Sequence, residues 1–199
     1  MNWGQRLARL ATDVVVRMPA LWWLFRGPLR RTFDNLAPVW DQYRSPDAFA
    51  PVEAALDRLE GAPRRVLDVG TGTGAVAALI ADRFPEAEVV AVDVSERMIE
   101  QARRKAGERV RFEVADAERL PFGDGSFDLV TLGNMIPFFD ELARVTAAGG
   151  RVLFAFSAGA ETPIYVRSET LRRRLGARGF AEFAEFSAGH GTAVLAKKR

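Results

Sequence analysis

The chain has no cysteine and only one histidine, His190, among its 199 residues. Without cysteine it can form no disulfide bond, thiolate nucleophile or cysteine-ligated zinc, and one histidine is too few for a histidine-rich metal site. We therefore expect no metal, and a reducing, cytoplasmic location. The longest apolar run near the start, residues 18–25, is far shorter than the roughly 20 residues that a membrane-spanning helix needs. Neither a transmembrane segment nor a secretory signal is predicted.

Charge is nearly balanced overall but unevenly distributed. Lysine and arginine number 28 and aspartate and glutamate 26. Residues 1–44 hold seven basic and three acidic side chains, residues 45–150 twelve and nineteen, and residues 151–199 nine and four. The acidic middle fits a domain that handles a cationic ligand at its centre, and the small net charge gives no argument for nucleic acid.

The hydrophobic pattern divides the chain into two parts, residues 1–60 and residues 61–199. The first is interpreted as a helical extension or lid: an amphipathic helix over 2–17, interruptions at Pro19 and at the Gly27-Pro28 pair, and a further helix over 51–59. The second alternates between strand and helix patterns, which is typical of βαβ units.

In this second part the predicted strands are 65–69, 88–93, 109–115, 127–132, 150–156, 180–186 and 192–197, and the predicted helices are 74–84, 95–106, 138–146 and 167–177. We therefore expect an α/β fold with a doubly wound, seven-stranded, Rossmann-like sheet. Six strands should be parallel and the last, which closes a hairpin, antiparallel.

The segment Val66-Leu67-Asp68-Val69-Gly70-Thr71-Gly72-Thr73-Gly74 is an apolar strand that ends in a glycine-rich turn and opens a helix. Glycines let a ligand approach the backbone, and the free N–H groups of a helix start attract a carboxylate or phosphate. Gly70, Gly72 and Ala75 also satisfy the dinucleotide pattern, so a nicotinamide-dependent oxidoreductase is an alternative.

Acidic residues at three predicted strand ends favour a cationic cofactor over a pyrophosphate. Asp68 stands two residues before the first glycine, where it would repel a pyrophosphate but attract an ammonium or a sulfonium. Asp93 ends the next strand at the position from which a carboxylate can accept both ribose hydroxyls. Asp116 follows the third strand, where an adenine amino group could donate to it.

From about Phe33 to Arg199 the chain resembles a class I S-adenosylmethionine-dependent methyltransferase, nearest the ubiquinone/menaquinone-biosynthesis or "type 11" group. The resemblance rests on four motifs in order, VLDVGTGTG, AVDVSERMIEQARRK, DAERLPFGDGSFDLV and FDELARVTAAGGRVL, and on residues 33–41, which resemble the family's cofactor lid. It implies S-adenosyl-L-methionine as cofactor, held by Asp68, Gly70, Thr71, Gly72, Asp93, Val94, Met98, Asp116, Ala117 and Asn134.

Departures from the family pattern lie on the substrate side. Trp40 stands where the family commonly has tyrosine, Ala147-Ala148-Gly149-Gly150 replaces a Pro-Gly-Gly turn, and the substrate-capping insertion of larger relatives is missing. We expect a small-molecule acceptor, hydrophobic or lipid-like, near Trp40, Tyr43, Met135 and Phe138, although Phe138 also fits a buried helix face.

No catalytic residue is assigned, because positioning alone can supply most of the catalysis of methyl transfer from a sulfonium. His190 could act as a base, but a turn histidine is more often inert. A non-catalytic S-adenosylmethionine-binding module is the second alternative.

Aromatic and basic side chains alternate between residues 17 and 31. They are Arg17, Trp22, Trp23, Phe25, Arg26, Arg30 and Arg31. This pattern resembles an interfacial anchor, which would give peripheral contact with the inner membrane face, but a cover over the substrate mouth or a dimer contact is the more common reason for such aromatics. The oligomeric state stays open.

Overall fold

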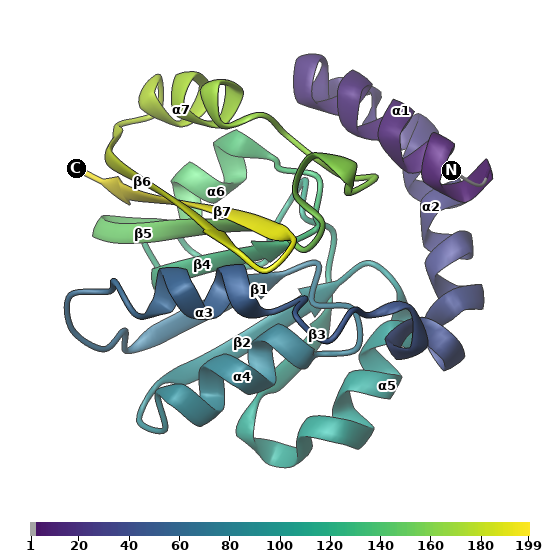
Figure 1. The fold of residues 1–199 in the computed structure, drawn as a ribbon, viewed down its shortest axis with the longest axis horizontal. Helices are drawn as coiled ribbons and strands as arrows, with labels where there is room; N and C mark the ends of the chain where they lie inside the picture. The colour runs from purple at the N-terminus through teal and green to yellow at the C-terminus, as the bar shows by residue number, and fades with distance from the viewer. Residues whose placement is uncertain (1–2) are drawn as a thin grey trace.

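The computed structural model, which describes residues 3–199, contains one seven-stranded sheet in the order β3-β2-β1-β4-β5-β7-β6 (Figure 1). The strands are β1 (Arg65–Val69), β2 (Glu88–Asp93), β3 (Arg111–Val114), β4 (Phe127–Gly133), β5 (Thr146–Phe156), β6 (Phe180–Ala188) and β7 (Gly191–Lys198). β7 pairs antiparallel with both β5 and β6, and the other neighbours pair parallel. The predicted fold class, with six strands in one direction and the last one reversed, is confirmed.

The central strands are mostly apolar because both faces of the sheet are covered. In β1 and β2, successive side chains belong alternately to two cores: Leu67 and Val90 to one, Val66 and Val89 to the other. This alternation follows from the two-residue period of a strand. The central strands are therefore held from both sides, and their carboxyl ends are fixed in place.

Helices cover both faces of the sheet. The second core contains side chains from α3 (Ala50–Leu56), α4 (Ala75–Arg83) and α5 (Glu96–Ala106). The first contains side chains from α6 (Phe139–Val145) and α7 (Ser168–Gly176), and also from α1 (Trp3–Arg17) and α2 (Trp22–Leu36). α3, although it precedes residue 60, packs on the sheet through Val52, Ala55 and Leu56. Short 3-10 segments lie at Pro19–Leu21, Ala37–Tyr43, Gly107–Arg109 and Gly159–Glu161.

The predicted interruption at Gly27-Pro28 is wrong, because α2 runs through Pro28 without a break. An interior proline removes one helical hydrogen bond and costs about 3 kcal/mol. Tertiary contacts outweigh this cost, since α2 buries Trp22 and Leu29 on either side of the proline. The break occurs earlier, at Pro19, as predicted.

The N-terminal helices stand beside the carboxyl ends of the strands (Figure 1). On α1, the Arg9 guanidinium donates to the Thr162 carbonyl at 2.8 Å. α2 contacts α5, and its side chains reach residues that follow β2 and β3. Among residues 3–199 there is no helix that combines the length and the apolar character needed to cross a bilayer.

Candidate functional site

The turn after β1 forms the floor of the candidate site. The N–H groups of Gly70 and Thr71 donate to the Val92 carbonyl at 2.8 and 3.0 Å, which holds the turn against the end of β2. Gly70 has a φ of +72° and Gly72 a φ of +55°, a region that side chains other than glycine rarely adopt. These two glycines therefore set a backbone path against which the side chains of Met135 and Trp40 pack closely.

Asp68 lies at the end of β1 and is only 1% exposed. Its Oδ1 accepts a hydrogen bond from the Thr131 hydroxyl at 2.6 Å, whereas its Oδ2 has no partner among the described residues. Burial raises the pKa of this carboxyl group, and the nearby Thr131 and Thr71 hydroxyls oppose that shift only in part. A buried carboxylate oxygen without a partner is costly unless a cationic or donor group reaches it.

Asp93 ends β2 and connects two loops. Its Oδ2 accepts from the Gly72 N–H and its Oδ1 from the Ser95 N–H, both at 2.9 Å. Burial raises the pKa of Asp93 to about 6, and the negative charges of Asp68 and Asp34 add to that shift. Asp68 and Asp93 thus share one acidic environment, which a positively charged ligand would relieve.

The predicted adenine side lies around the N-terminus of α5. Ser95 caps this helix by accepting the Met98 N–H at 3.1 Å, and Met98 is 1% exposed. Ala117, beyond β3, is also buried, and Val94 is partly exposed between Asp93 and the cap. Of these three residues, Val94 is the one with exposed surface beside Asp93, whereas Met98 and Ala117 are covered by other residues of the chain.

Asp116 already has several partners in this structure. It accepts the Trp22 indole N–H at 2.9 Å and the Arg26 guanidinium at 3.1 Å, both from α2, and its own loop adds the Glu118 N–H at 3.0 Å. A ligand that uses this carboxylate must therefore share it with α2 or displace the more exposed partner, Arg26.

The loop after β4 brings Asn134, Met135 and Phe138 to the same edge. The Asn134 amide exchanges hydrogen bonds with Ser157 at 2.9 and 3.0 Å, so this side chain ties the ends of β4 and β5 together. The Met135 side chain lies over Gly70, where a Cβ atom would approach its sulfur to 2.6 Å. Phe138 is buried and packs edge-on against Trp22, with ring centroids 5.4 Å apart.

Residues 22–43, comprising α2 and the following 3-10 segment, form what we call the cover. The Trp40 ring packs edge-on against the Phe33 ring. A Cβ atom added at Gly72 would lie 3.4 Å from the Trp40 indole nitrogen. Asp34 accepts the Ser95 hydroxyl at 2.6 Å. The cover therefore rests on the glycine turn and on the cap of α5.

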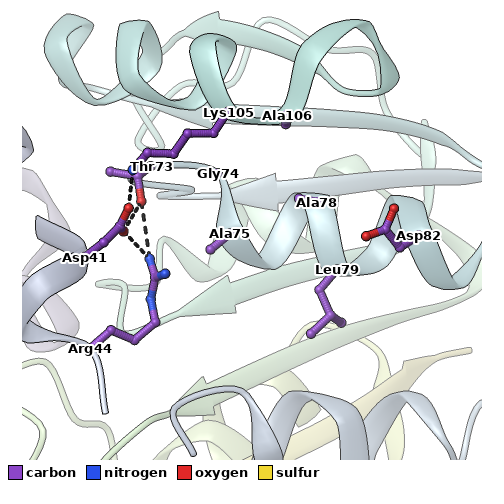
Figure 2. A pocket seen from close by; sticks show the side chains of 10 residues that line it. All are labelled: Asp41, Arg44, Thr73, Gly74, Ala75, Ala78, Leu79, Asp82, Lys105 and Ala106. Atoms are coloured by element: carbon purple, nitrogen blue, oxygen red, sulfur yellow. Dashed lines mark hydrogen bonds and ion pairs between the residues drawn. The ribbon is translucent and has the colours of Figure 1, made fainter. Parts of the chain in front are cut away.

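Asp41 anchors the end of the cover at a separate hollow (Figure 2). Its carboxylate accepts hydrogen bonds from the Thr73 hydroxyl at 2.6 Å and from Arg44 at 2.5 Å, and it also pairs with Lys105. Burial opposes ionisation, but these hydrogen bonds and charges outweigh it and lower the pKa of Asp41. The hollow, about 430 Å³, is lined from α4 and α5, and none of Asp68, Asp93 and Asp116 lines it.

Two sequence candidates lie apart from this arrangement. The Tyr43 side chain is 72% exposed, at the outer end of the cover. His190 is exposed in the β6–β7 turn, with its Nδ1 2.7 Å from an Asp47 carboxylate oxygen. Conversely, sequence reasoning missed Asp34, Asp41 and Lys105, because a single charged residue carries no signal of a distant partner.

The fold of this chain is that of solved methyltransferase structures. Residues 66–153 match a family model described as a methyltransferase domain. A solved structure of a SAM-dependent methyltransferase from Aquifex aeolicus superposes with a TM-score of 0.68 at 19% identity, covering 82% of this chain and 97% of that one. A solved structure of PigF with SAH superposes with a TM-score of 0.58 at 21% identity, covering 75% of this chain and 56% of that one. These likenesses show the methyltransferase fold.

Curated methyltransferases match part of the chain in sequence. The chain is 48% identical over 105 residues to a demethylmenaquinone methyltransferase of Thermus thermophilus, covering 48% of each chain. It is 41% identical over 142 residues to a malonyl-[acyl-carrier protein] O-methyltransferase of Geobacter sulfurreducens, covering 66% of this chain and 53% of that one. A methyltransferase domain therefore occupies residues 66–153, and the chain is similar in sequence to methyltransferases named for menaquinone and for malonyl-[acyl-carrier protein] substrates. The chain spans about half the length of the curated relatives it matches.

Proposed function

We propose that this chain transfers a methyl group from S-adenosylmethionine to a small hydrophobic acceptor at the carboxyl edge of the sheet. One observation carries the proposal: the buried Asp68 has a carboxylate oxygen without a partner, beside the glycine turn and within electrostatic reach of Asp93. S-adenosylmethionine brings an ammonium and a sulfonium to such a place, whereas the pyrophosphate of a nicotinamide cofactor would be repelled.

The residues of the floor fit this cofactor. Asp68 would attract its cationic groups, and the Thr71 hydroxyl, which lies within reach of Asp68 but makes no hydrogen bond of good geometry among the described residues, offers a further polar contact. Gly70 and Gly72 would let the methionyl part approach the backbone once the Met135 and Trp40 side chains, which lie over them here, move aside. Asn134 borders the same edge, although its amide is engaged with Ser157.

The nucleoside would bind beside the floor. Asp93 would accept the ribose hydroxyls, Val94 and Met98 would pack on the adenine face, and Asp116 with Ala117 would meet the adenine edge. In this arrangement Asp116 keeps its hydrogen bond from Trp22 and accepts a further hydrogen bond from the adenine. The exposed Arg26 would give up its place at Asp116 to that new donor.

When bound, the cofactor supplies a methyl group already attached to a good leaving group. The contribution of the chain is to orient the acceptor for in-line attack and to exclude water, and neither role requires a base. Trp40, Met135 and Phe138 would form apolar walls for that purpose, and Tyr43 would lie at the entrance. The relatives' names, which include demethylmenaquinone and malonyl-[acyl-carrier protein], support a small acceptor group without choosing between them.

The test is a calorimetric titration of the full chain with S-adenosylmethionine, S-adenosylhomocysteine and a reduced nicotinamide dinucleotide. We expect both adenosyl compounds to bind and the dinucleotide not to bind. Methyl-labelled cofactor is then incubated with quinone precursors and acyl-carrier substrates, and S-adenosylhomocysteine is measured. Dinucleotide binding without S-adenosylmethionine binding would overturn the proposal, and cofactor binding without turnover across the panel would favour a non-catalytic binding module.

A further inference from the structure

An exposed patch of apolar and basic side chains surrounds the junction of α1 and α2. Of six strongly exposed large apolar side chains in the described residues, three lie here: Met18 (56% exposed), Trp23 (67%) and Leu24 (46%). Trp22, next in sequence to Trp23, is 3% exposed and faces Asp116. One face of α2 therefore closes the candidate site, and the opposite face presents apolar side chains to solvent.

The exposed apolar side chains lie among arginines that have few partners. We define the junction patch as Met18, Trp23 and Leu24 with Arg17, Arg30 and Arg31. No acidic residue occurs between positions 17 and 31. Arg17, Arg30 and Arg31 are exposed and form no ion pair within residues 3–199, and Arg26 pairs only with Asp116. The patch is therefore both apolar and strongly cationic.

We propose that the junction patch docks on an anionic lipid bilayer. Tryptophan and leucine side chains enter the boundary between headgroups and acyl chains, while arginines meet the lipid phosphates. Charge complementarity selects this occupant over a second copy of the chain, because two such patches facing each other would bring arginines against arginines.

Docking through α2 has a consequence for the site. α2 reaches Asp116 and Ser95 through Trp22 and Asp34, so the helix that would lie on the bilayer also borders the carboxyl edge of the sheet. The docking proposal rests on the proposed function in one respect, the hydrophobic acceptor. Such an acceptor could pass from the lipid to the site without crossing water.

The experiment is flotation of the full chain with phosphatidylcholine vesicles, with and without phosphatidylglycerol. We expect binding only to the vesicles that contain phosphatidylglycerol, weakened by added salt because salt screens the arginines. Replacing both arginines in Arg30→Gln/Arg31→Gln should weaken binding roughly 25-fold, at about fivefold for each charge near the surface. Trp23→Ser/Leu24→Ser should weaken it by about tenfold or more through loss of buried apolar area.

Matched controls remove the same groups elsewhere. Arg58→Gln/Arg64→Gln deletes two exposed arginines that flank the start of β1, at the opposite edge of the sheet, and Val114→Ser deletes a 51% exposed apolar side chain outside the patch. These variants should float like the wild type. Calorimetry with S-adenosylmethionine should give wild-type affinity for the four patch substitutions, which separates a failure of docking from a failure of the proposed function.

Three outcomes would overturn the proposal. The first is no flotation of the intact chain with anionic vesicles. The second is vesicle binding that Trp23→Ser/Leu24→Ser leaves unchanged, since that would be attraction of a basic surface without insertion. The third is a dimer in light scattering without lipid that Trp23→Ser converts to monomer, which would assign the patch to a second copy of the chain.

Discussion

The floor of the site and its cover meet at the same sheet edge, but different interactions hold them. Backbone hydrogen bonds join the floor to β2, and Asp68 is buried at the centre of the floor. The cover is held by a few side chains: Trp22 on Asp116, Asp34 on Ser95 and Asp41 on Thr73. Local unfolding follows the number of buried contacts, so the cover should open at a smaller free energy than the floor.

The comparison also shows where each region carries its charge. The floor holds carboxylates that are short of positive partners, and the pKa of Asp93 is raised to about 6. The cover supplies Arg26 at its inner surface and leaves Arg30 and Arg31 to solvent. A cationic ligand is thus attracted to the floor, while the outer surface of the cover attracts anions.

The largest effect is expected from Asp68→Asn. This change keeps the shape but removes the buried negative charge, so S-adenosylmethionine affinity should fall roughly one hundredfold. Thermal stability should be unchanged or higher, because an ionised carboxylate no longer has to be buried. Calorimetry and a thermal melt measure both, with the exposed Glu108→Gln as control. Wild-type affinity in Asp68→Asn would remove the electrostatic basis of the site.

A change at Trp22 should loosen the cover and leave the floor intact. Trp22→Phe keeps an aromatic ring on Phe138 but deletes the N–H that donates to Asp116. A hydrogen bond to a charged group contributes about 2 kcal/mol. Hydrogen exchange should therefore speed up in α2 with little change in β1 and β2. Equal acceleration in the sheet would mean that the two regions unfold as one unit.

The pH dependence of cofactor binding should report Asp93. Ribose hydroxyls donate better to the ionised carboxylate, so the complex has the lower pKa and binding releases a proton. Affinity should then rise with pH by up to about tenfold per unit below the free-protein pKa of about 6, and level off above it. Calorimetry between about pH 5 and pH 7 measures the slope. Asp93→Asn should bind more weakly and without this slope, and a persistent slope would assign the titration to another group.

The stability of the free chain should vary in the opposite direction over the same range. The folded-state pKa of Asp93, about 6, lies above the roughly 3.9 of an unfolded aspartate. Between these values the folded state keeps a proton that the unfolded state has lost, so the contribution of Asp93 to the free energy of unfolding decreases as pH rises. Denaturation of wild type and Asp93→Asn over this window isolates that contribution.

The smallest effect is expected from Asp41→Asn. The Asp41 and Lys105 side chains are 34% and 45% exposed, so solvent screens their ion pair, and we expect a loss of at most about 1 kcal/mol. Because the pKa of Asp41 is lowered, its contribution is present near neutral pH and disappears as the carboxyl group protonates in acid. Limited proteolysis after residue 43 should be modestly faster in the variant. An unchanged proteolysis rate at neutral pH would show that the contacts with Thr73 and Arg44 hold the cover without the charge of Asp41.

Much of the floor could be predicted from short-range patterns. Residues 66–74 show the order of strand, glycine turn and helix start. The roles predicted for Asp68 and Asp93 follow from their positions at strand ends. The cover could be predicted only in outline. Pro28 in α2 and the opposite burial of Trp22 and Trp23 depend on residues more than ninety positions away along the chain, including Asp116.

The amino-acid sequence by itself determined the alternation of strands and helices, the glycine turn and the acidic strand ends, because these depend on local periodicity and backbone freedom. Only the tertiary structure decided which side chains of the N-terminal helices face the site and which face solvent. A helix pattern specifies an apolar side but not its partner, and the partner here comes from packing against loops that follow β2 and β3.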